Sequence, residues 1–176
     1  LSRYKLLRKA YEKADLKTDP DYAEFLKEEK DWLQDYCLFM AIKNDQKGIC
    51  WIDWPEELKD RHSKAVKEAE KELAEEIEFY RFQQYCFTTQ WRKLKAYANK
   101  KGISIIGDVP IYVALDSSDA WANPEMLQFD EDYDPKAVAG CPPDAFSATG
   151  QLWGNPLYDW KALKKDGYGW WVQRMT

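Results

Sequence analysis

The chain changes character at Lys101 and Gly102, and this change constrains the fold more than any other feature. Before it, apolar residues recur with the helical period of about 3.6 residues. After it, Ile103–Val109 is short, apolar and rich in β-branched residues, which is typical of a strand buried in a parallel sheet. A helix, a glycine turn and a buried strand form one unit of a doubly wound sheet or a (β/α)8 barrel. The sequence therefore predicts an α/β fold.

Three helical stretches are predicted before this change. The first is Arg3–Lys13, and the second starts with Asp19 as N-cap and Pro20 at the first helical position, continuing to about Ile42. The third is Glu56–Lys100, whose first half is highly charged and predicted to be exposed. The aromatic second half is predicted to be buried, with an apolar side formed by Trp91, Leu94 and Tyr97.

A long connection follows the predicted strand and leads to a last predicted helix, Asp159–Met175. It takes about 45 residues after Val113, and loops of this length are usually functional. Because it leaves the carboxyl end of a strand, it lies where α/β folds build their sites. Asp108, near that strand end, is a candidate for the mouth of an active site or for a structural carboxylate that binds loop amides.

Within this connection, 140–160 combines four aromatic residues, three prolines and three glycines with only two charges. Such a segment can hold flat rings in a fixed shape beside amide and carboxylate groups, a combination that suits a sugar. The alternative is that the rings only anchor the loop, and we favour this for Tyr158 and Trp160. The predicted substrate-binding residues are Asp144, Phe146, Gln151, Trp153 and Asn155.

Composition excludes several other classes of function. The net charge of −5 and the absence of a basic stripe argue against a nucleic-acid partner. Four scattered cysteines and one histidine, His62, argue against a zinc site, so we expect no metal and no cofactor. No apolar run approaches the roughly 20 residues of a membrane helix, and a cytoplasmic protein is expected. His62 is expected on the surface, whereas Trp51 and Trp54 could form a sugar platform or, more in keeping with a helix connector, a hydrophobic seam.

Three motifs closely resemble the 4-alpha-glucanotransferase family, whose members are also called amylomaltase or disproportionating enzyme. They are the segments 105–114 (Ile-Ile-Gly-Asp-Val-Pro-Ile-Tyr-Val-Ala), 119–125 (Asp-Ala-Trp-Ala-Asn-Pro-Glu) and 141–160. Residues 32–41 and 82–91 are also similar to this family, so the resemblance covers most of the chain. It implies a (β/α)8 TIM barrel with helical insertions that transfers α-1,4-glucan segments between maltodextrins with retention of configuration.

The resemblance also implies roles for individual residues. Asp108 matches an aspartate after the third barrel strand that supports the site. The segment 144–150 matches a loop that arches over the donor and acceptor subsites, and Trp153 and Asn155 match positions that line the groove. Ala145 stands where some relatives carry Tyr, which leaves the closure of this loop in question.

By the same resemblance, residues 1–100 form a helical insertion subdomain, and 101–176 form a barrel strand, the active-site loop and the following helix. The fragment is expected to be mostly helical with one or two short strands. The Arg-Ile-Asp-His type motif of the nucleophile and the acid/base Glu are not found, so we expect a central fragment with no catalytic residue, inactive alone and prone to self-association. The alternatives are a stand-alone carbohydrate-binding domain and a purely helical interaction piece.

Overall fold

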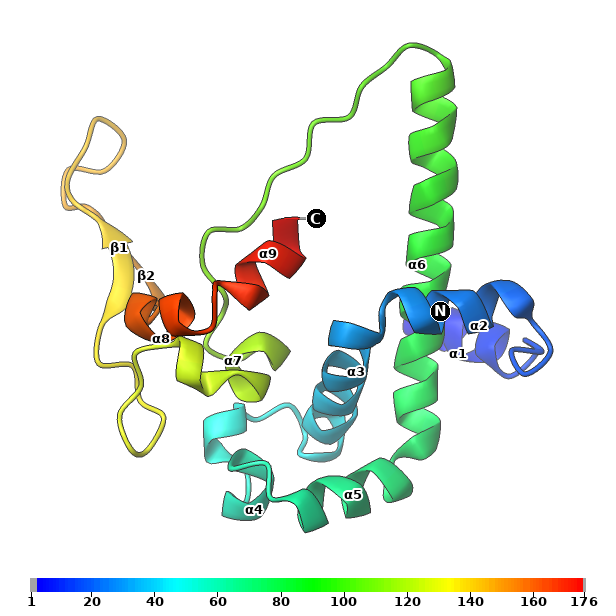
Figure 1. The fold of residues 1–176 in the computed structure, drawn as a ribbon, viewed down its shortest axis with the longest axis horizontal. Coiled ribbons are helices and arrows are strands. Elements are labelled where there is room, and N and C mark those ends of the chain that lie inside the picture. The colour runs from blue at the N-terminus through cyan, green and yellow to red at the C-terminus, as the bar shows by residue number, and fades with distance from the viewer. Residues whose placement is uncertain (1–2, 176) are drawn as a thin grey trace. The chain divides into compact units, whose positions relative to one another are not determined.

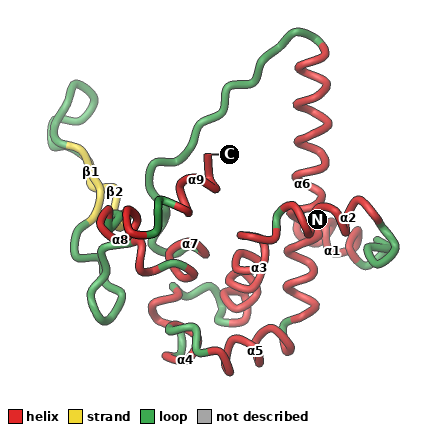
Figure 2. The backbone as a smooth tube through the Cα atoms, in the orientation of Figure 1, coloured by secondary structure: helices red, strands yellow, loops and turns green. Residues whose placement is uncertain are grey.

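The computed structural model describes residues 3–175 and is mostly helical, with one two-stranded antiparallel sheet (Figures 1 and 2). The chain divides into two compact units. The first contains 3–48 and 63–109, and the second contains 49–62 and 110–175. The predicted division into 1–100 and 101–176 stays a prediction about the parent fold. Among the described residues, 49–62 belong to the same unit as the C-terminal half of the chain.

The first unit is built from helices that pack mainly as α3 against α6. Its described elements are α1 (Arg3–Tyr11), α2 (Pro20–Glu28), α3 (Lys30–Asp45), α5 (Ser63–Glu72) and α6 (Ala74–Lys100). Apolar residues on the facing sides of these helices form the core, since removing their side chains from water stabilises the packed state. The buried residues include Phe25, Leu33, Cys37, Leu38, Ile42, Ile77, Phe79 and Phe82.

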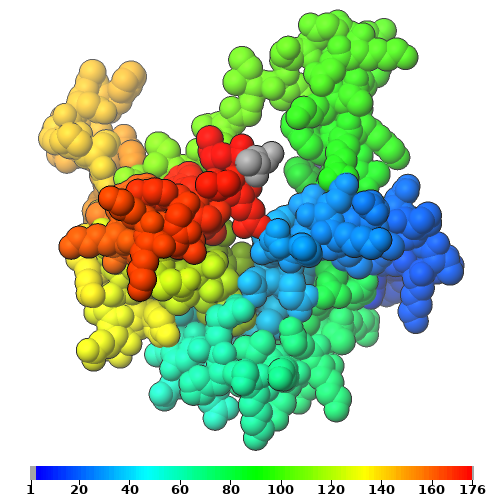
Figure 3. All heavy atoms as spheres, viewed as in Figure 1, coloured from blue at the N-terminus to red at the C-terminus, as the bar shows by residue number. Residues whose placement is uncertain are grey.

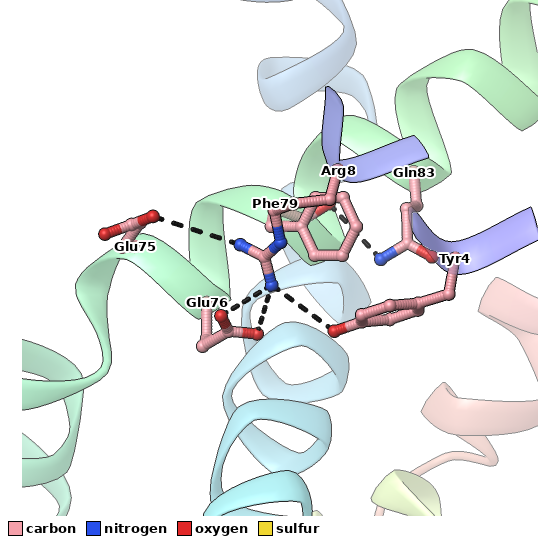
Figure 4. A network of polar contacts seen from close by, with 6 residues as sticks. All are labelled: Tyr4, Arg8, Glu75, Glu76, Phe79 and Gln83. Carbon is pink, nitrogen blue, oxygen red and sulfur yellow. Dashed lines mark hydrogen bonds and ion pairs between the residues drawn. The ribbon is translucent and has the colours of Figure 1, made fainter. Parts of the chain in front are cut away.

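A polar network attaches α1 to the start of α6 (Figure 4). The Nη2 atom of Arg8 donates to both carboxylate oxygens of Glu76, at 2.5 and 2.7 Å, and contacts the hydroxyl of Tyr4 at 3.3 Å. The same guanidinium lies 3.7 Å from the centre of the Phe79 ring. Because a charge-assisted pair and a cation–π contact act on one side chain, Arg8 fixes how α1 lies on α6.

Local helix signals predict the start of α2 but not all helix breaks. Asp19 is the N-cap, as predicted, and its Oδ1 accepts from the amides of Asp21 and Tyr22 at 2.9 and 3.3 Å. Pro20 holds the first helical position. The single helix predicted beyond it is instead broken at Glu29, whose backbone leaves the helical region (φ −98°, ψ 11°) before α3 begins. The predicted Glu56–Lys100 stretch is likewise divided into three helices, namely α4 (Glu56–Lys59), α5 and α6.

The prediction that the aromatic second half of Glu56–Lys100 is buried is confirmed where that half begins and wrong toward its end. Trp91, Leu94 and Tyr97 are 41%, 55% and 64% exposed, whereas the start of α6 supplies buried residues such as Phe79 and Phe82. The helical period identifies an apolar side correctly. It cannot say whether another element covers that side, because burial is a property of the packed neighbours.

The predicted buried strand Ile103–Val109 is also absent. These residues form an extended, exposed stretch without ladder pairing, drawn as loop after α6 in Figure 2, and Ile106 is 95% exposed. A parallel strand needs neighbouring strands to satisfy its amide and carbonyl groups. In the described part of the chain, the two named strands pair with each other, so this segment has no strand beside it.

The second unit contains short helices and a β-hairpin. Its described elements are η1 (Trp51–Asp53), α4 (Glu56–Lys59), α7 (Ser118–Ala122), η2 (Pro124–Met126), β1 (Val138–Cys141), β2 (Gln151–Pro156), α8 (Trp160–Lys165) and α9 (Gly169–Met175). The predicted helix Asp159–Met175 is therefore two helices, separated at Asp166–Tyr168. Ser117 caps α7 by accepting from the amide of Ala120 at 3.2 Å, as serine commonly does before a helical turn.

Tryptophan side chains form the centre of the second unit. Trp51 and Trp121 are fully buried and Trp54 is 4% exposed. The Nε1 atom of Trp51 donates to the Leu115 carbonyl at 2.7 Å, and that of Trp121 donates to the Leu58 carbonyl at 3.0 Å. The hydrophobic-seam interpretation of Trp51 and Trp54 is confirmed, and the sugar platform is wrong because neither ring is accessible.

Buried tyrosines make both units sensitive to alkaline pH. Burial raises the pKa of Tyr80 and of Tyr158 from the ordinary value of 10.0 to about 12. The sign follows from linkage: this contribution to stability is complete below pH 10, the unfolded value, and is lost as pH rises through about 12. We expect part of the tyrosinate absorbance to appear together with the loss of helical circular dichroism. Ionisation of all tyrosines before any unfolding would contradict this.

Residues 3–175 contain no group of three or more histidine, cysteine, aspartate and glutamate side chains arranged to hold a metal ion. None of the helices in this range combines the length and apolar character of a transmembrane segment. His62 is 55% exposed at its side chain and lies 3.9 Å from an oxygen of Asp60, which confirms its predicted place on the surface.

Candidate functional site

The predicted substrate-binding residues lie on the β1–β2 hairpin and its loop, in the second unit (Figure 1). The strands pair at Cys141 with Gln151, at Gly140 with Leu152 and at Val138 with Pro156. Between the last two pairs, a single residue of β1 faces three residues of β2, namely 153–155. Such a bulge changes where side chains point, and here it contains Trp153 and Asn155.

The loop 142–150 is held in shape by its own polar groups. Oδ1 of Asp144 accepts from the amides of Phe146 and Ser147 at 2.9 and 2.8 Å. The Ser147 hydroxyl donates to the carbonyl of Gly150 at 2.7 Å, which closes the loop from the other side. An aspartate that binds amides two and three residues ahead stabilises a tight turn. Asp144 therefore has a structural role here, and its predicted contact with sugar stays a prediction.

The loop presents Phe146 to solvent. Its side chain is 96% exposed, and the tip of the hairpin projects from the rest of its unit in Figure 3. Leu152 is 81% exposed and Trp153 49% exposed on the adjacent strand. Large apolar side chains gathered on one exposed hairpin are typical of a surface that contacts a ligand or another part of a protein.

Trp153 has a defined orientation although it is half exposed. Its Nε1 donates to Oε1 of Gln151 at 3.0 Å, and its ring centre lies 6.2 Å from that of Tyr112. The structure thus brings Gln151 and Trp153 together, and their contact with a sugar stays a prediction. A flat ring beside an amide side chain can cover the C–H face of a sugar while the amide binds a hydroxyl.

The side chain of Asn155 is bound to the protein backbone, and Asp108 belongs to a different unit from the hairpin. Asn155 is half-buried, and its Nδ2 donates to the carbonyl of Val113 at 2.8 Å. Asp108 is exposed, and its supporting role stays a prediction.

Sequence reasoning missed Tyr112. Its ring centre lies 6.2 Å from that of Trp153 and 6.2 Å from that of the buried Tyr158, to which it is nearly parallel at 14°. The anchoring role predicted for Tyr158 is confirmed by its 2% exposure, whereas Trp160 remains 56% exposed although it packs 5.5 Å from Tyr158. An aromatic residue three positions after the end of the predicted strand was the available signal for Tyr112.

The role of Asp144 can be separated into charge and hydrogen bonding. Asp144→Asn keeps an acceptor oxygen for the two amides and should preserve the loop. Asp144→Ala removes both bonds and should speed amide hydrogen exchange at Phe146 and Ser147 by about tenfold, corresponding to about 1.4 kcal/mol of local stability. Equal exchange rates in the two variants would show that these bonds do not hold the loop.

A family model for 4-alpha-glucanotransferase matches residues 1–176, the full length of this chain. The chain belongs to the 4-alpha-glucanotransferase family. This confirms the resemblance carried by the three motifs. The family's proteins are much longer: the chain spans from a quarter to about a third of the length of the relatives described next.

The relatives come from bacteria and plants. The 4-alpha-glucanotransferase of Clostridium butyricum is 49% identical over 174 residues, which is 98% of this chain and 36% of that protein. The Thermus thermophilus protein is 49% identical across 93% of this chain and 33% of its own length. The chloroplastic/amyloplastic 4-alpha-glucanotransferase of Solanum tuberosum is 51% identical across 82% of this chain and 25% of its own length.

A solved structure shares the arrangement of the chain. The amylomaltase from Streptococcus agalactiae, determined in complex with acarbose, has 41% sequence identity and a TM-score of 0.90. The match covers 98% of this chain and 35% of that structure.

Proposed function

We propose that this chain forms the helical and hairpin-bearing part of a 4-alpha-glucanotransferase that moves α-1,4-glucan segments between maltodextrins with retention of configuration. Family membership supports the reaction class. The amylomaltase of similar structure, solved with acarbose, supports an oligosaccharide as substrate. The parent fold in this proposal is a (β/α)8 barrel, in which Ile103–Val109 would gain strand neighbours.

One observation carries the proposal. The hairpin presents Phe146 at 96% exposure and Trp153 at 49% exposure on a loop fixed by Asp144 and Ser147. Exposed rings are normally mobile when nothing packs on them. Here hydrogen bonds hold the backbone of the loop 142–150 and the indole of Trp153. Preorganised rings of this kind bind sugar faces with little loss of conformational entropy.

The chemistry divides between this chain and the rest of the enzyme. Retaining transfer uses a carboxylate nucleophile and an acid/base carboxyl about 5 Å apart, through a covalent glycosyl-enzyme intermediate. We assign those groups to the part of the relatives that this chain does not span. This chain holds the glucan and, by covering the intermediate with Phe146 and Trp153, favours a sugar hydroxyl over water as acceptor.

The proposal is tested in the natural polypeptide that contains residues 1–176, with maltotriose as donor and acceptor. We expect glucose and longer maltodextrins, with the ratio of transfer to hydrolysis lowered about tenfold in Phe146→Ala. Trp160→Ala is the control, because that ring is also exposed, at 56%, but lies outside the hairpin. Absence of products longer than maltotriose from the unaltered polypeptide would refute the proposed function.

The 176-residue chain by itself is proposed to be inactive, cytoplasmic and self-associating. Its exposed apolar residues on α6 and along 103–111 support self-association. Sedimentation should show species larger than a monomer at high concentration, and the maltotriose assay should show no turnover. A clean monomer would count against the first expectation and detectable transfer against the second.

A second candidate, carbohydrate binding without catalysis, rests on the same exposed rings. In that case maltoheptaose would quench tryptophan fluorescence saturably, Trp153→Ala would remove the response, and the natural polypeptide would form no products.

A further inference from the structure

Three consecutive carbonyl groups after the extended stretch accept hydrogen bonds from side chains instead of from a backbone ladder. The donors come from separate parts of the second unit: β2, the turn before α7, and η1. The pairs are Asn155 Nδ2 to Val113 O at 2.8 Å, Ser117 Oγ to Ala114 O at 2.7 Å, and Trp51 Nε1 to Leu115 O at 2.7 Å. We call Asn155, Ser117 and Trp51 the carbonyl clamp.

Asn155 is the member of the carbonyl clamp that belongs to the hairpin. Its partner, Val113, is only 5% exposed, so water cannot easily replace the bond. A buried carbonyl that loses its donor costs the full desolvation free energy of that group. The bond therefore ties β2 firmly to the segment that follows Ile111.

This bond also affects Tyr112, whose ring neighbours that of Trp153. Tyr112 precedes Val113 in the chain, and its ring centre lies 6.2 Å from that of Trp153 and 6.2 Å from that of the buried Tyr158. Tyr112 is bonded to Val113 through a planar peptide unit, so fixing Val113 limits where the backbone of Tyr112 can lie. Asn155 and Trp153 are two residues apart in the same bulge, so one side chain anchors the bulge while the other is exposed.

We propose that Asn155 is a positioning residue for Trp153, acting through the carbonyl of Val113 and the ring of Tyr112, and is not itself a ligand of the sugar. The inference rests on the proposed function, since it concerns how the chain presents a ring to a glucan. The Asn155 side chain that the sequence pattern assigned to sugar hydroxyls has its amide nitrogen committed to the protein backbone.

Aspartate at this position separates the two roles. It has nearly the same shape as asparagine and is a strong acceptor for sugar hydroxyls, so a direct ligand role would tolerate Asn155→Asp. It has no N–H to donate, and it would place a carboxylate oxygen against the Val113 carbonyl. A positioning role therefore predicts that Asn155→Asp is as harmful as Asn155→Ala.

The test uses the natural polypeptide labelled with 5-fluorotryptophan and followed by fluorine NMR, with the Trp153 signal identified by its loss in Trp153→Phe. In the absence of sugar, Asn155→Asp and Asn155→Ala should both shift or broaden this signal. Both should weaken maltoheptaose binding by about tenfold, which corresponds to about 1.4 kcal/mol. Ser117→Ala, which removes the neighbouring bond of the carbonyl clamp, should lower thermal stability but leave the Trp153 signal unchanged.

Each outcome decides one question. An unchanged Trp153 signal with wild-type affinity in Asn155→Asp would overturn the positioning role. Equal shifts in the Ser117→Ala variant would also overturn it, because they would show a general loss of structure. If maltoheptaose does not perturb Trp153 in the unaltered polypeptide, the proposed function fails, while the sugar-free spectra still test the positioning of Trp153.

Discussion

Replacing Gly150 with alanine should open the tip of the hairpin and remove most of its function. Gly150 has a φ of +75°, and a Cβ atom there would lie 2.5 Å from the carbonyl oxygen of Cys141 and 3.1 Å from the carbonyl carbon of Pro142. The left-handed backbone alone costs about 1–2 kcal/mol for alanine. The contacts add to this, since they involve backbone atoms that cannot move aside independently.

The expected result for Gly150→Ala is a loss of transfer from maltotriose of at least about 100-fold in kcat/KM, or about 2.7 kcal/mol. Amide exchange at Phe146 and Ser147 should become fast in the same variant. This second measurement does not depend on the reaction, so it tests the loop geometry even if the substrate is different.

Alanine substitutions at two other glycines separate the cost of backbone strain from the cost of close atomic contacts. Gly167 has a φ of +70°, and no atom lies within 4 Å of the position that a Cβ atom would occupy there, so alanine brings only backbone strain. Gly140 lacks a positive φ, but a Cβ atom there would lie 2.5 Å from the carbonyl oxygen of Gln151, so alanine brings only the contact. We expect Gly150→Ala to be the most damaging of the three. An effect no larger than that of Gly167→Ala would show that the loop relaxes around the methyl group.

Trp51→Ala should be the most destabilising single change in the second unit. The side chain is fully buried, donates to Leu115 and packs edge to face on Tyr133 with ring centres 5.1 Å apart. Truncating a buried tryptophan typically costs about 3–5 kcal/mol of unfolding free energy. Trp51→Phe keeps a ring but leaves the Leu115 carbonyl without this donor, and should cost about 1–3 kcal/mol.

Denaturant titration measures these differences in unfolding free energy, provided that the slope of free energy against denaturant concentration is the same in all variants. Trp160→Ala is the control, because that side chain is 56% exposed and its removal should cost less than about 1 kcal/mol. A cost for Trp51→Ala as small as that of the control would mean that Trp51 is not part of the core. Equal costs for the alanine and phenylalanine variants would assign the whole effect to the hydrogen bond.

Local features of the fold could be predicted because their causes lie within a few residues. Asp19 before Pro20, and Ser117 before a short helical turn, carry the oxygen atoms that cap a helix, and both do so. Trp51 and Trp54 were correctly expected in a seam, since rings in a helix connector usually fill the space between elements.

Burial that depends on distant neighbours could not be predicted. The apolar side of α6 and the stretch Ile103–Val109 have the composition of core, yet Leu94 and Ile106 are exposed. The candidate site shows the same limit. Sequence identified the residues of the hairpin, but the bulge that places Trp153 and Asn155 follows from strand register, and the use of Asp144 as a turn cap follows from loop geometry.

The discontinuity of the second unit has a consequence for folding order. Residues 49–62 join it from the middle of the first unit, and the bond between Trp51 and Leu115 spans 64 residues of sequence. Closing such a long segment costs entropy before its contacts repay it, so this unit should form late. Separating the chain at residue 100 would part Trp51 from Leu115 and divide the core of the second unit between the two pieces. Cleavage within the exposed stretch 103–109 of the folded chain would instead give two polypeptides. We expect them to remain associated through the buried tryptophans of the second unit.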